Sequence, residues 1–337
     1  MATVDLFAIG NALIDQEFKV SNEFLTQQAL QKGTMQLTDG ETQAALYQQL
    51  QDTQNYKGQA SGGSAANTTV AFSALGGTAF YGCRVGNDDL GSIYLNGLNQ
   101  AGIKTAAQSI SEGVTGTCMV LISPDSERTM HTYLGITAEL TAEQIDFEPL
   151  KAAKWLYIEG YLSTSDTARV AVKQARELAK AHGVKIALSL SDPAMVQYAR
   201  QGLEELLDDG VDLLFCNEQE ALMFSNTETL GAAIEVLKSK NQHIVITQGA
   251  NGAVIIDPEQ QFHVAGREVH AVDTNGAGDA FAGAFLYAIN AGLTLEAAAQ
   301  LAILISSEVV AQFGPRLAVE NYAKLFEQFK NSQQEYA

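Results

Sequence analysis

The chain has 337 residues, enough to bury a large core in one α/β domain, with or without a small appendage. Its 39 acidic and 20 basic side chains give a formal net charge of −19, which repels polyphosphate backbones and anionic membrane surfaces. We therefore expect neither nucleic acid nor a membrane as a partner. A nucleotide can still bind, because backbone amides and a few well-placed cations hold phosphates inside acidic proteins.

The cysteines and the N-terminus indicate the cellular compartment. Cys83, Cys118 and Cys216 lie far apart and form no C-x-x-C pair. This pattern favours unpaired thiols in a reducing compartment over a disulfide framework or a zinc site. The first ten residues carry Asp5 inside a short apolar run and contain no Lys or Arg, unlike a secretory signal. We expect a cytoplasmic protein.

The first third of the chain predicts a small β-sheet beside the start of a larger one. Apolar runs at 7–11, 78–85 and 117–122 have the length and composition of strands. Two segments, 15–38 and 113–134, mix β-branched, polar and turn residues without helical spacing. We predict that these two segments pair into a lid. The main domain then comprises residues 1–14, 39–112 and 135–330, followed by a polar tail at 331–337.

From residue 153 onward, apolar runs of strand length alternate with amphipathic helical stretches. Ser165 or Asp166 can cap the first helix and Gly183 can end it. Strands are predicted at 153–157, 184–190, 211–216 and 243–247, and helices at 164–182, 202–207, from 218, and from near 276 and 294. Such alternation predicts an α/β fold with a mainly parallel sheet, helices on both faces and ligand sites at the carboxyl ends of strands.

Residues 272–285, VDTNGAGDAFAGAF, form a small-residue turn that leads directly into an apolar helix. Gly276, Ala277 and Gly278 have almost no side chain, so backbone N–H groups at the helix start can close around an anion. Asp279 follows in the first helical turn, where an ordinary carboxylate is ionised at neutral pH and can accept the proton of an attacking hydroxyl. Taken alone, this pattern fits equally well a loop whose aspartate merely favours the helix start.

A second small-residue loop, SGGSAANTTVA at residues 61–71, also enters a helix. Together the two loops resemble the paired signatures of the PfkB, or ribokinase-like, carbohydrate and nucleoside kinases. The resemblance covers nearly the whole chain. It implies a three-layer α/β fold with a small β-sheet lid, and an ATP-dependent transfer of the γ-phosphoryl group to a sugar hydroxyl with Asp279 as the base.

The resemblance also implies where ATP and cations bind. Asn217 and Glu220 match an N-x-x-E motif whose glutamate helps to hold Mg²⁺ and the phosphates, commonly through water. Thr247 and Gly249 match a strand-end turn that approaches the ATP phosphates. Asp273 lies where relatives often bind a monovalent cation such as K⁺. Each motif, taken alone, also fits a plain structural role: an acidic helix start, a tight turn or a hydrogen-bonded aspartate.

For the acceptor, the resemblance implies contacts from Asp15, Gly62, Gly63 and Asn67, and a phosphate contact from Arg128 in the lid. A carboxylate and an amide can fix two neighbouring hydroxyls, while glycine lets a sugar approach the backbone. The alternatives are a solvated acid at Asp15, a helix cap at Asn67 and a surface arginine at Arg128.

Within the family, the chain is most similar to the adenosine kinases, on segments 10–15, 115–118, 158–161, 188–193 and 211–218. Two features depart from that branch. Leu162 stands where a second aromatic residue after Tyr161 would stack on a purine, and Ala65–Ala66 fits the sugar kinases better. We expect the 5′-hydroxyl of adenosine as acceptor, with ribose, fructose or 2-keto-3-deoxygluconate as alternatives. The resemblance further allows a homodimer through the lid.

Other classes of α/β protein fit less well. No G-x-G-x-x-G links an N-terminal strand to a helix, as a nicotinamide-dependent dehydrogenase requires, and no G-x-x-x-x-G-K-[ST] marks a P-loop enzyme. A non-catalytic nucleotide or sugar binder remains a remote alternative, because the residues of both signature loops are intact.

Overall fold

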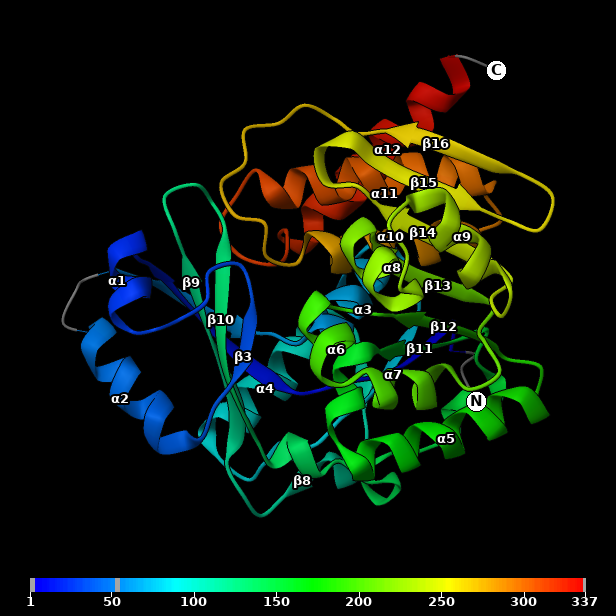
Figure 1. The fold of residues 1–337 in the computed structure, drawn as a ribbon. Helices are drawn as coiled ribbons and strands as arrows, with labels where there is room; N and C mark the ends of the chain where they lie inside the picture. Colours follow the sequence, from blue (N-terminus) through cyan, green and yellow to red (C-terminus); the bar gives the residue numbers. More distant parts are fainter. Residues whose placement is uncertain (1–3, 52–54, 336–337) are drawn as a thin grey trace.

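A computed structural model describes residues 4–51 and 55–335, which form a large sheet between two helical layers and a smaller sheet beside it (Figure 1). All pairs of the large sheet are parallel except the two that involve β15. The mainly parallel sheet predicted from the alternating pattern is thus confirmed. Its spatial order is β16 (Gln261–Ala265), β15 (Gly252–Ile256), β14 (His243–Thr247), β13 (Leu213–Asn217), β12 (Lys185–Ser189), β11 (Trp155–Glu159), β1 (Leu6–Ile9), β5 (Ala79–Gly82) and β7 (Lys104–Thr105).

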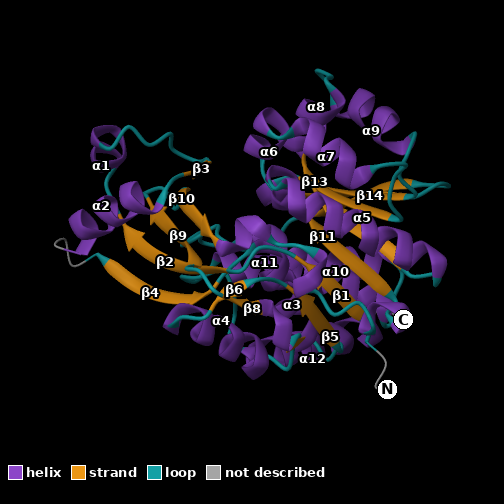
Figure 2. Ribbon diagram, turned by 90° about the horizontal axis from the view of Figure 1, so that it is seen from below, coloured by secondary structure: helices purple, strands orange, loops and turns teal. Residues whose placement is uncertain are grey.

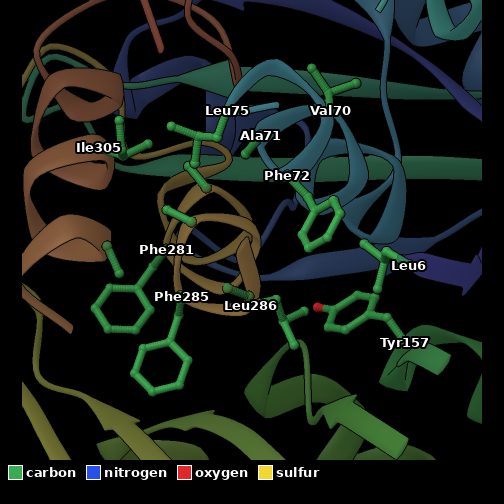
Figure 3. Packing of buried hydrophobic residues seen from close by; sticks show 14 of the residues in the cluster. Leu6, Val70, Ala71, Phe72, Leu75, Tyr157, Phe281, Phe285, Leu286 and Ile305 are labelled. Atoms are coloured by element: carbon green, nitrogen blue, oxygen red, sulfur yellow. The ribbon is translucent and has the colours of Figure 1, made fainter. Parts of the chain in front are cut away.

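Helices cover both faces of this sheet, and strand β1 shows why. Its side chains point alternately to opposite faces, so Leu6 packs in one core cluster and Phe7 in the other, both fully buried. Figure 3 shows Leu6 in the first cluster with Phe72 and Phe285. That cluster includes α3 (Ser64–Ala74), α4 (Asp89–Gln100), α10 (Ala277–Asn290), α11 (Leu295–Val310) and α12 (Val319–Glu335), whereas the other includes α5 (Asp166–Ala181), α6 (Pro193–Tyr198), α7 (Arg200–Leu207), α8 (Glu218–Ser225) and α9 (Leu230–Lys238).

The expected small sheet is present, but it has more elements than the sequence predicted (Figure 2). Its order is β3 (Met35–Leu37), β10 (Arg128–Gly135), β9 (Thr115–Ile122), β2 (Leu13–Lys19) and β4 (Tyr56–Ser61), with α1 (Asn22–Gln27) and α2 (Gly40–Gln51) on its outer face. Met119 and Leu121 of β9 contact these helices, whereas Cys118 and Val120 face the opposite way. A minor two-stranded sheet joins β6 (Val85–Gly86) and β8 (Ile110–Ser111).

Two boundaries drawn from the sequence need correction. Helix α2 and strand β4, placed in the main domain as part of 39–112, belong to the lid, because β4 pairs with β2 and α2 packs on the lid sheet. The expected polar tail at 331–337 begins inside α12, which continues to Glu335, while residues 336–337 lie outside the described part. Tyr322, Phe326 and Phe329 hold α12 on the core at helical spacing.

Within the described residues, the helices include none that is both long and apolar enough to cross a bilayer.

Candidate active site

A cavity of about 960 Å³ is lined by residues of the lid and of the main domain, including residues at the carboxyl ends of the parallel strands β11 to β14. Most of the residues predicted to carry the chemistry line it, although they come from distant parts of the chain. Gly62 and Asp273 are the exceptions, since they lie behind the wall of the cavity. The predicted residues that do line it are Asp15, Gly63, Asn67, Arg128, Asn217, Glu220, Thr247, Gly249, Gly276, Ala277, Gly278 and Asp279.

Asp279 occupies the first turn of α10, and α3 crosses this helix closely because residue 283 is glycine, whose missing side chain leaves room for the Thr68 carbonyl. This crossing brings Ser64 Oγ to 2.6 Å from Asp279 Oδ1 and Asn67 Nδ2 to 2.9 Å from Oδ2. Burial raises the pKa of Asp279, and the two hydrogen bonds oppose that rise. The sequence alone suggested an ordinary carboxylate at Asp279, whereas in the structure burial and two hydrogen bonds act on it in opposite directions.

The glycines of the anion-binding loop differ in what surrounds them. Gly276 precedes α10 with φ +73°, and a Cβ there would overlap the carbonyl oxygen of Pro315. Apart from its chain neighbours and the backbone of its own helix, Gly278 has no protein atom within 4 Å of the Cβ position, so space lies open beside it. N–H groups in a first helical turn have no acceptor within the helix. The open space can therefore hold an anion against the start of α10.

Asp273 braces this loop from behind. It is fully buried, and its two carboxylate oxygens accept the backbone N–H groups of Asn275, at 2.8 Å, and Gly314, at 3.0 Å. The aspartate therefore ties the anion-binding loop to the segment that follows α11.

On the acceptor side, Asp15 of β2 is buried beside Gly62, where a Cβ would overlap its carboxylate. Gly63 has φ +89°, and a Cβ there would overlap the Asn11 carbonyl. The pKa of Asp15 is raised to about 7, chiefly by burial; Arg316 opposes the rise and Asp279 adds to it. Gly62 thus acts by admitting the Asp15 side chain rather than by lining the cavity.

Arg128 is not a solvated surface residue. It begins β10 in the lid, lines the cavity, and its Nη1 donates to the Thr274 carbonyl at 2.9 Å. The lid therefore contacts the anion-binding loop directly through a cation.

At the other end of the cavity, Asn217 and Glu220 form a reciprocal cap at the start of α8. The Asn217 side chain accepts the Glu220 N–H at 2.8 Å, while Glu220 accepts the Asn217 backbone N–H at 3.0 Å. Asn217 Nδ2 also donates to Glu220 at 2.6 Å. Burial raises the pKa of Glu220 to about 8. Thr247 ends β14, and Gly249 follows it with φ +56° and open space at its Cβ position.

Sequence reasoning assigned no role to Ser64, Glu159 or Arg316. Glu159 is fully buried at the end of β11 and accepts the N–H groups of Asn11 and Ala65, each at 2.7 Å. It thereby joins the loop after β1 to the start of α3, and burial raises its pKa to about 7. The sequence does show an acidic residue at the end of an apolar strand, which could have drawn attention to Glu159. Its role could not be predicted, because its partners lie more than 90 residues away in the sequence.

The acceptor end of the cavity has an apolar wall supplied by the lid. Tyr161 lines the cavity, whereas Leu162 is fully buried in the main core. Cys118 is a free cysteine that also lines the cavity. The remaining apolar lid residues on this wall are Leu13, Met35, Leu37, Met130 and Leu134.

Comparisons with known proteins identify the family of the chain. The family model described as "pfkB family carbohydrate kinase" matches residues 5–321. The crystal structure of adenosine kinase from Sinorhizobium meliloti superposes with a TM-score of 0.91 and 33% identity, covering 97% of this chain and 99% of that one. Adenosine kinase from Saccharomyces cerevisiae is 28% identical, covering 96% and 100% of the two chains, and ribokinase from Mus musculus is 30% identical, covering 70% and 73%. The chain therefore belongs to the pfkB family of carbohydrate kinases.

Proposed function

We propose that this kinase transfers the γ-phosphoryl group of ATP to the 5′-hydroxyl of adenosine. The observation that carries the proposal is Asp279, held by Ser64 and Asn67 beside an open anion site at the start of α10. As the acceptor oxygen bonds to the γ-phosphorus, the bond from that phosphorus to the bridging β,γ-oxygen breaks. The acceptor proton passes to the Asp279 carboxylate, and ADP leaves.

The surrounding residues support this step by holding groups in place. Ser64 and Asn67 fix both carboxylate oxygens, so Asp279 meets the hydroxyl in one orientation. Backbone N–H groups near Gly278, together with Arg128 from the lid, offer positive charge to the transferring phosphoryl group. Closure of the lid would exclude water and so limit hydrolysis of ATP.

The donor groups fit Mg²⁺ held mainly by phosphates and water. Both oxygens of Glu220 already accept hydrogen bonds from Asn217, so this carboxylate would reach a cation through water. Among the described residues, no cluster of three or more His, Cys, Asp or Glu could form a protein cage for a metal. Mg²⁺ prefers such sparsely liganded sites, and when bound it neutralises charge on the phosphate oxygens. We place a monovalent cation such as K⁺ near Asp273 as a further proposal.

The acceptor wall favours a nucleoside over a free sugar. A purine would cover the apolar lid residues Leu37, Met130 and Leu134 and lie near the ring of Tyr161, whereas a free sugar would leave them exposed to water. A free sugar such as ribose, fructose or 2-keto-3-deoxygluconate remains the second candidate. It is supported by Ala65–Ala66 in the first signature and by the ribokinase relative.

The test is coupled ADP release with MgATP against adenosine, inosine, ribose, fructose and 2-keto-3-deoxygluconate. We expect selective turnover of adenosine, and turnover of a free sugar alone would overturn the choice of acceptor. Asp279→Asn should retain folding and ATP binding but lower kcat by about 10²- to 10⁴-fold, the usual cost of losing a general base. Near-normal turnover by that variant would rule out Asp279 as the base.

Two further features belong to the proposal. Because α1 and α2 cover the outer apolar face of the lid sheet, we place the contact of a homodimer at an edge of the sheet, on β4, the longer of its two edge strands β3 and β4. Light scattering on wild type and on a variant with proline in β4 would test this pairing. A reducing, cytoplasmic location is supported by three buried, free cysteines, and localisation of a tagged full-length chain would test it.

A further inference from the structure

Arg316 does not line the cavity, but it contacts Asn67, which does. It sits between α11 and α12, and its Nε donates to Asn67 Oδ1 at 2.7 Å. Asn67 Nδ2 in turn donates to Asp279 Oδ2 at 2.9 Å. A hydrogen-bonded chain therefore runs from Arg316 through Asn67 to Asp279.

The direction of this chain is set by the chemistry of its ends. A guanidinium only donates and an ionised carboxylate only accepts, whereas an amide has one end of each kind. With Arg316 on one side, Asn67 presents its oxygen to the guanidinium and its nitrogen to Asp279. Without Arg316, the amide could turn over and place its oxygen against the Asp279 carboxylate, where the two would repel.

Arg316 also supplies charge where carboxylates gather. Burial raises the pKa of Asp15 and of Asp279; the charge of Arg316 opposes the rise at Asp15 and, together with Arg128, at Asp279. Arg128 comes from the lid, whereas Arg316 belongs to the main domain and does not depend on lid contacts. Its Nη2 is shielded from solvent and has no hydrogen-bond partner among the described residues. Leaving one nitrogen of a partly buried guanidinium without a hydrogen-bond partner is costly, which favours an electrostatic role for Arg316.

We propose, on the basis of the proposed function, that Arg316 is a positioning residue for phosphoryl transfer: it fixes the Asn67 amide and keeps the Asp279 carboxylate ionised. Several other groups contribute to the electrostatics of these two residues. Around Arg316 they are Tyr81, Tyr94, Asp15 and Tyr322, and around Asp279 they are Arg128, Asp15, Glu159, Tyr157, Tyr161 and Tyr322.

Three substitutions separate orientation from charge. Arg316→Met removes both, so kcat should fall by about 10- to 100-fold and the acid limb of kcat against pH should move up by about one unit. Arg316→Gln keeps a hydrogen-bond donor but no charge. It should therefore show the same shift of the acid limb as Arg316→Met, but a smaller loss of kcat at high pH. Arg316→Lys keeps the charge and should restore the limb. The KM for ATP should change little in all three, because Arg316 does not line the cavity.

A second readout does not depend on turnover. The side-chain ¹⁵NH₂ signal of Asn67, assigned by its loss in Asn67→Ala, should titrate with Asp279 and shift its midpoint upward in Arg316→Met. If wild type phosphorylates none of the acceptors, the proposed function fails while this titration still decides the role of Arg316. Arg200→Met, a surface arginine on α7 that pairs with Glu204, controls for loss of an arginine in general.

The proposal would be overturned if a folded Arg316→Met variant matched wild type in three quantities: kcat, the acid limb of kcat against pH, and the titration midpoint of the Asn67 side-chain signal. If that variant does not fold, the same comparison in Arg316→Gln decides it.

Discussion

Single residues in the anion-binding loop carry different constraints. At Gly276 the backbone has φ +73° and a side chain would meet Pro315, so Gly276→Ala should cost about 1–3 kcal/mol of stability. At Gly278 no neighbouring protein atom stands in the way. Gly278→Ala should therefore keep the wild-type Tm but lower kcat/KM for ATP, because the methyl group would occupy the phosphate space. Thermal unfolding and steady-state kinetics on both variants check this contrast.

Gly231→Ala in α9 is the matched control, since nothing lies within 4 Å of its Cβ position and it is far from the cavity lining. It should leave both Tm and kinetics close to wild type. Equal loss of stability in Gly276→Ala and Gly278→Ala would contradict the assignment of Gly278 to the phosphate space.

Among the elements, strand β2 carries two buried carboxyl groups on one face, Asp15 and Glu17. Burial, together with the nearby carboxylates of Asp273 and Asp15, raises the pKa of Glu17 to about 7. A group whose pKa is raised on folding favours the folded state at low pH, and this contribution is lost as pH rises through about 7. Glu17→Gln should therefore stabilise the unliganded protein by about 1–3 kcal/mol at pH 8 and by little at pH 5.

Urea unfolding at the two pH values measures this difference. Glu23→Gln, at an exposed glutamate on α1 in the same lid, is the control for the loss of a carboxyl group in general. If Glu17→Gln gained no stability at pH 8, ionising the Glu17 carboxyl group in the folded protein would cost no free energy of folding, which would contradict a raised pKa.

The elements also show what sequence alone could predict. After residue 153, the alternation of strand-like and helical segments is enough to predict the parallel sheet from short stretches of sequence. The observed strands β11 to β14 lie where that pattern predicted strands. Strand β4 gave no such signal, because an edge strand with Lys57 and Gly58 is mostly exposed, and its pairing with β2 spans some 40 residues. Asp279 and Gly276 can be identified from the sequence because both belong to one local motif. Arg316 cannot, because its partner Asn67 lies 249 residues away in the sequence and contacts it only in the folded chain.

For the whole molecule, the net charge of −19 bears on how ATP arrives. The cavity lining contains six acidic residues, Asp15, Glu127, Glu159, Glu220, Glu268 and Asp279, and two basic ones, Arg128 and Arg267. Because burial raises the pKa of Asp15, Glu159 and Glu220 to about 7 or 8, these three carry only part of their negative charge near neutral pH. An anionic nucleotide therefore approaches against the overall field of the protein, whereas a neutral nucleoside does not feel it.

Added salt should accordingly help ATP rather than hinder it. Between 10 and 150 mM tetramethylammonium chloride the screening length falls from about 30 to about 8 Å, so kcat/KM for MgATP should rise by about twofold or more. The value for adenosine is the internal control and should stay constant, because adenosine is uncharged. A gain seen only with KCl would instead report cation binding near Asp273. A fall in kcat/KM for MgATP with tetramethylammonium chloride would mean that the field of Arg128 and Arg267 dominates the approach of the nucleotide.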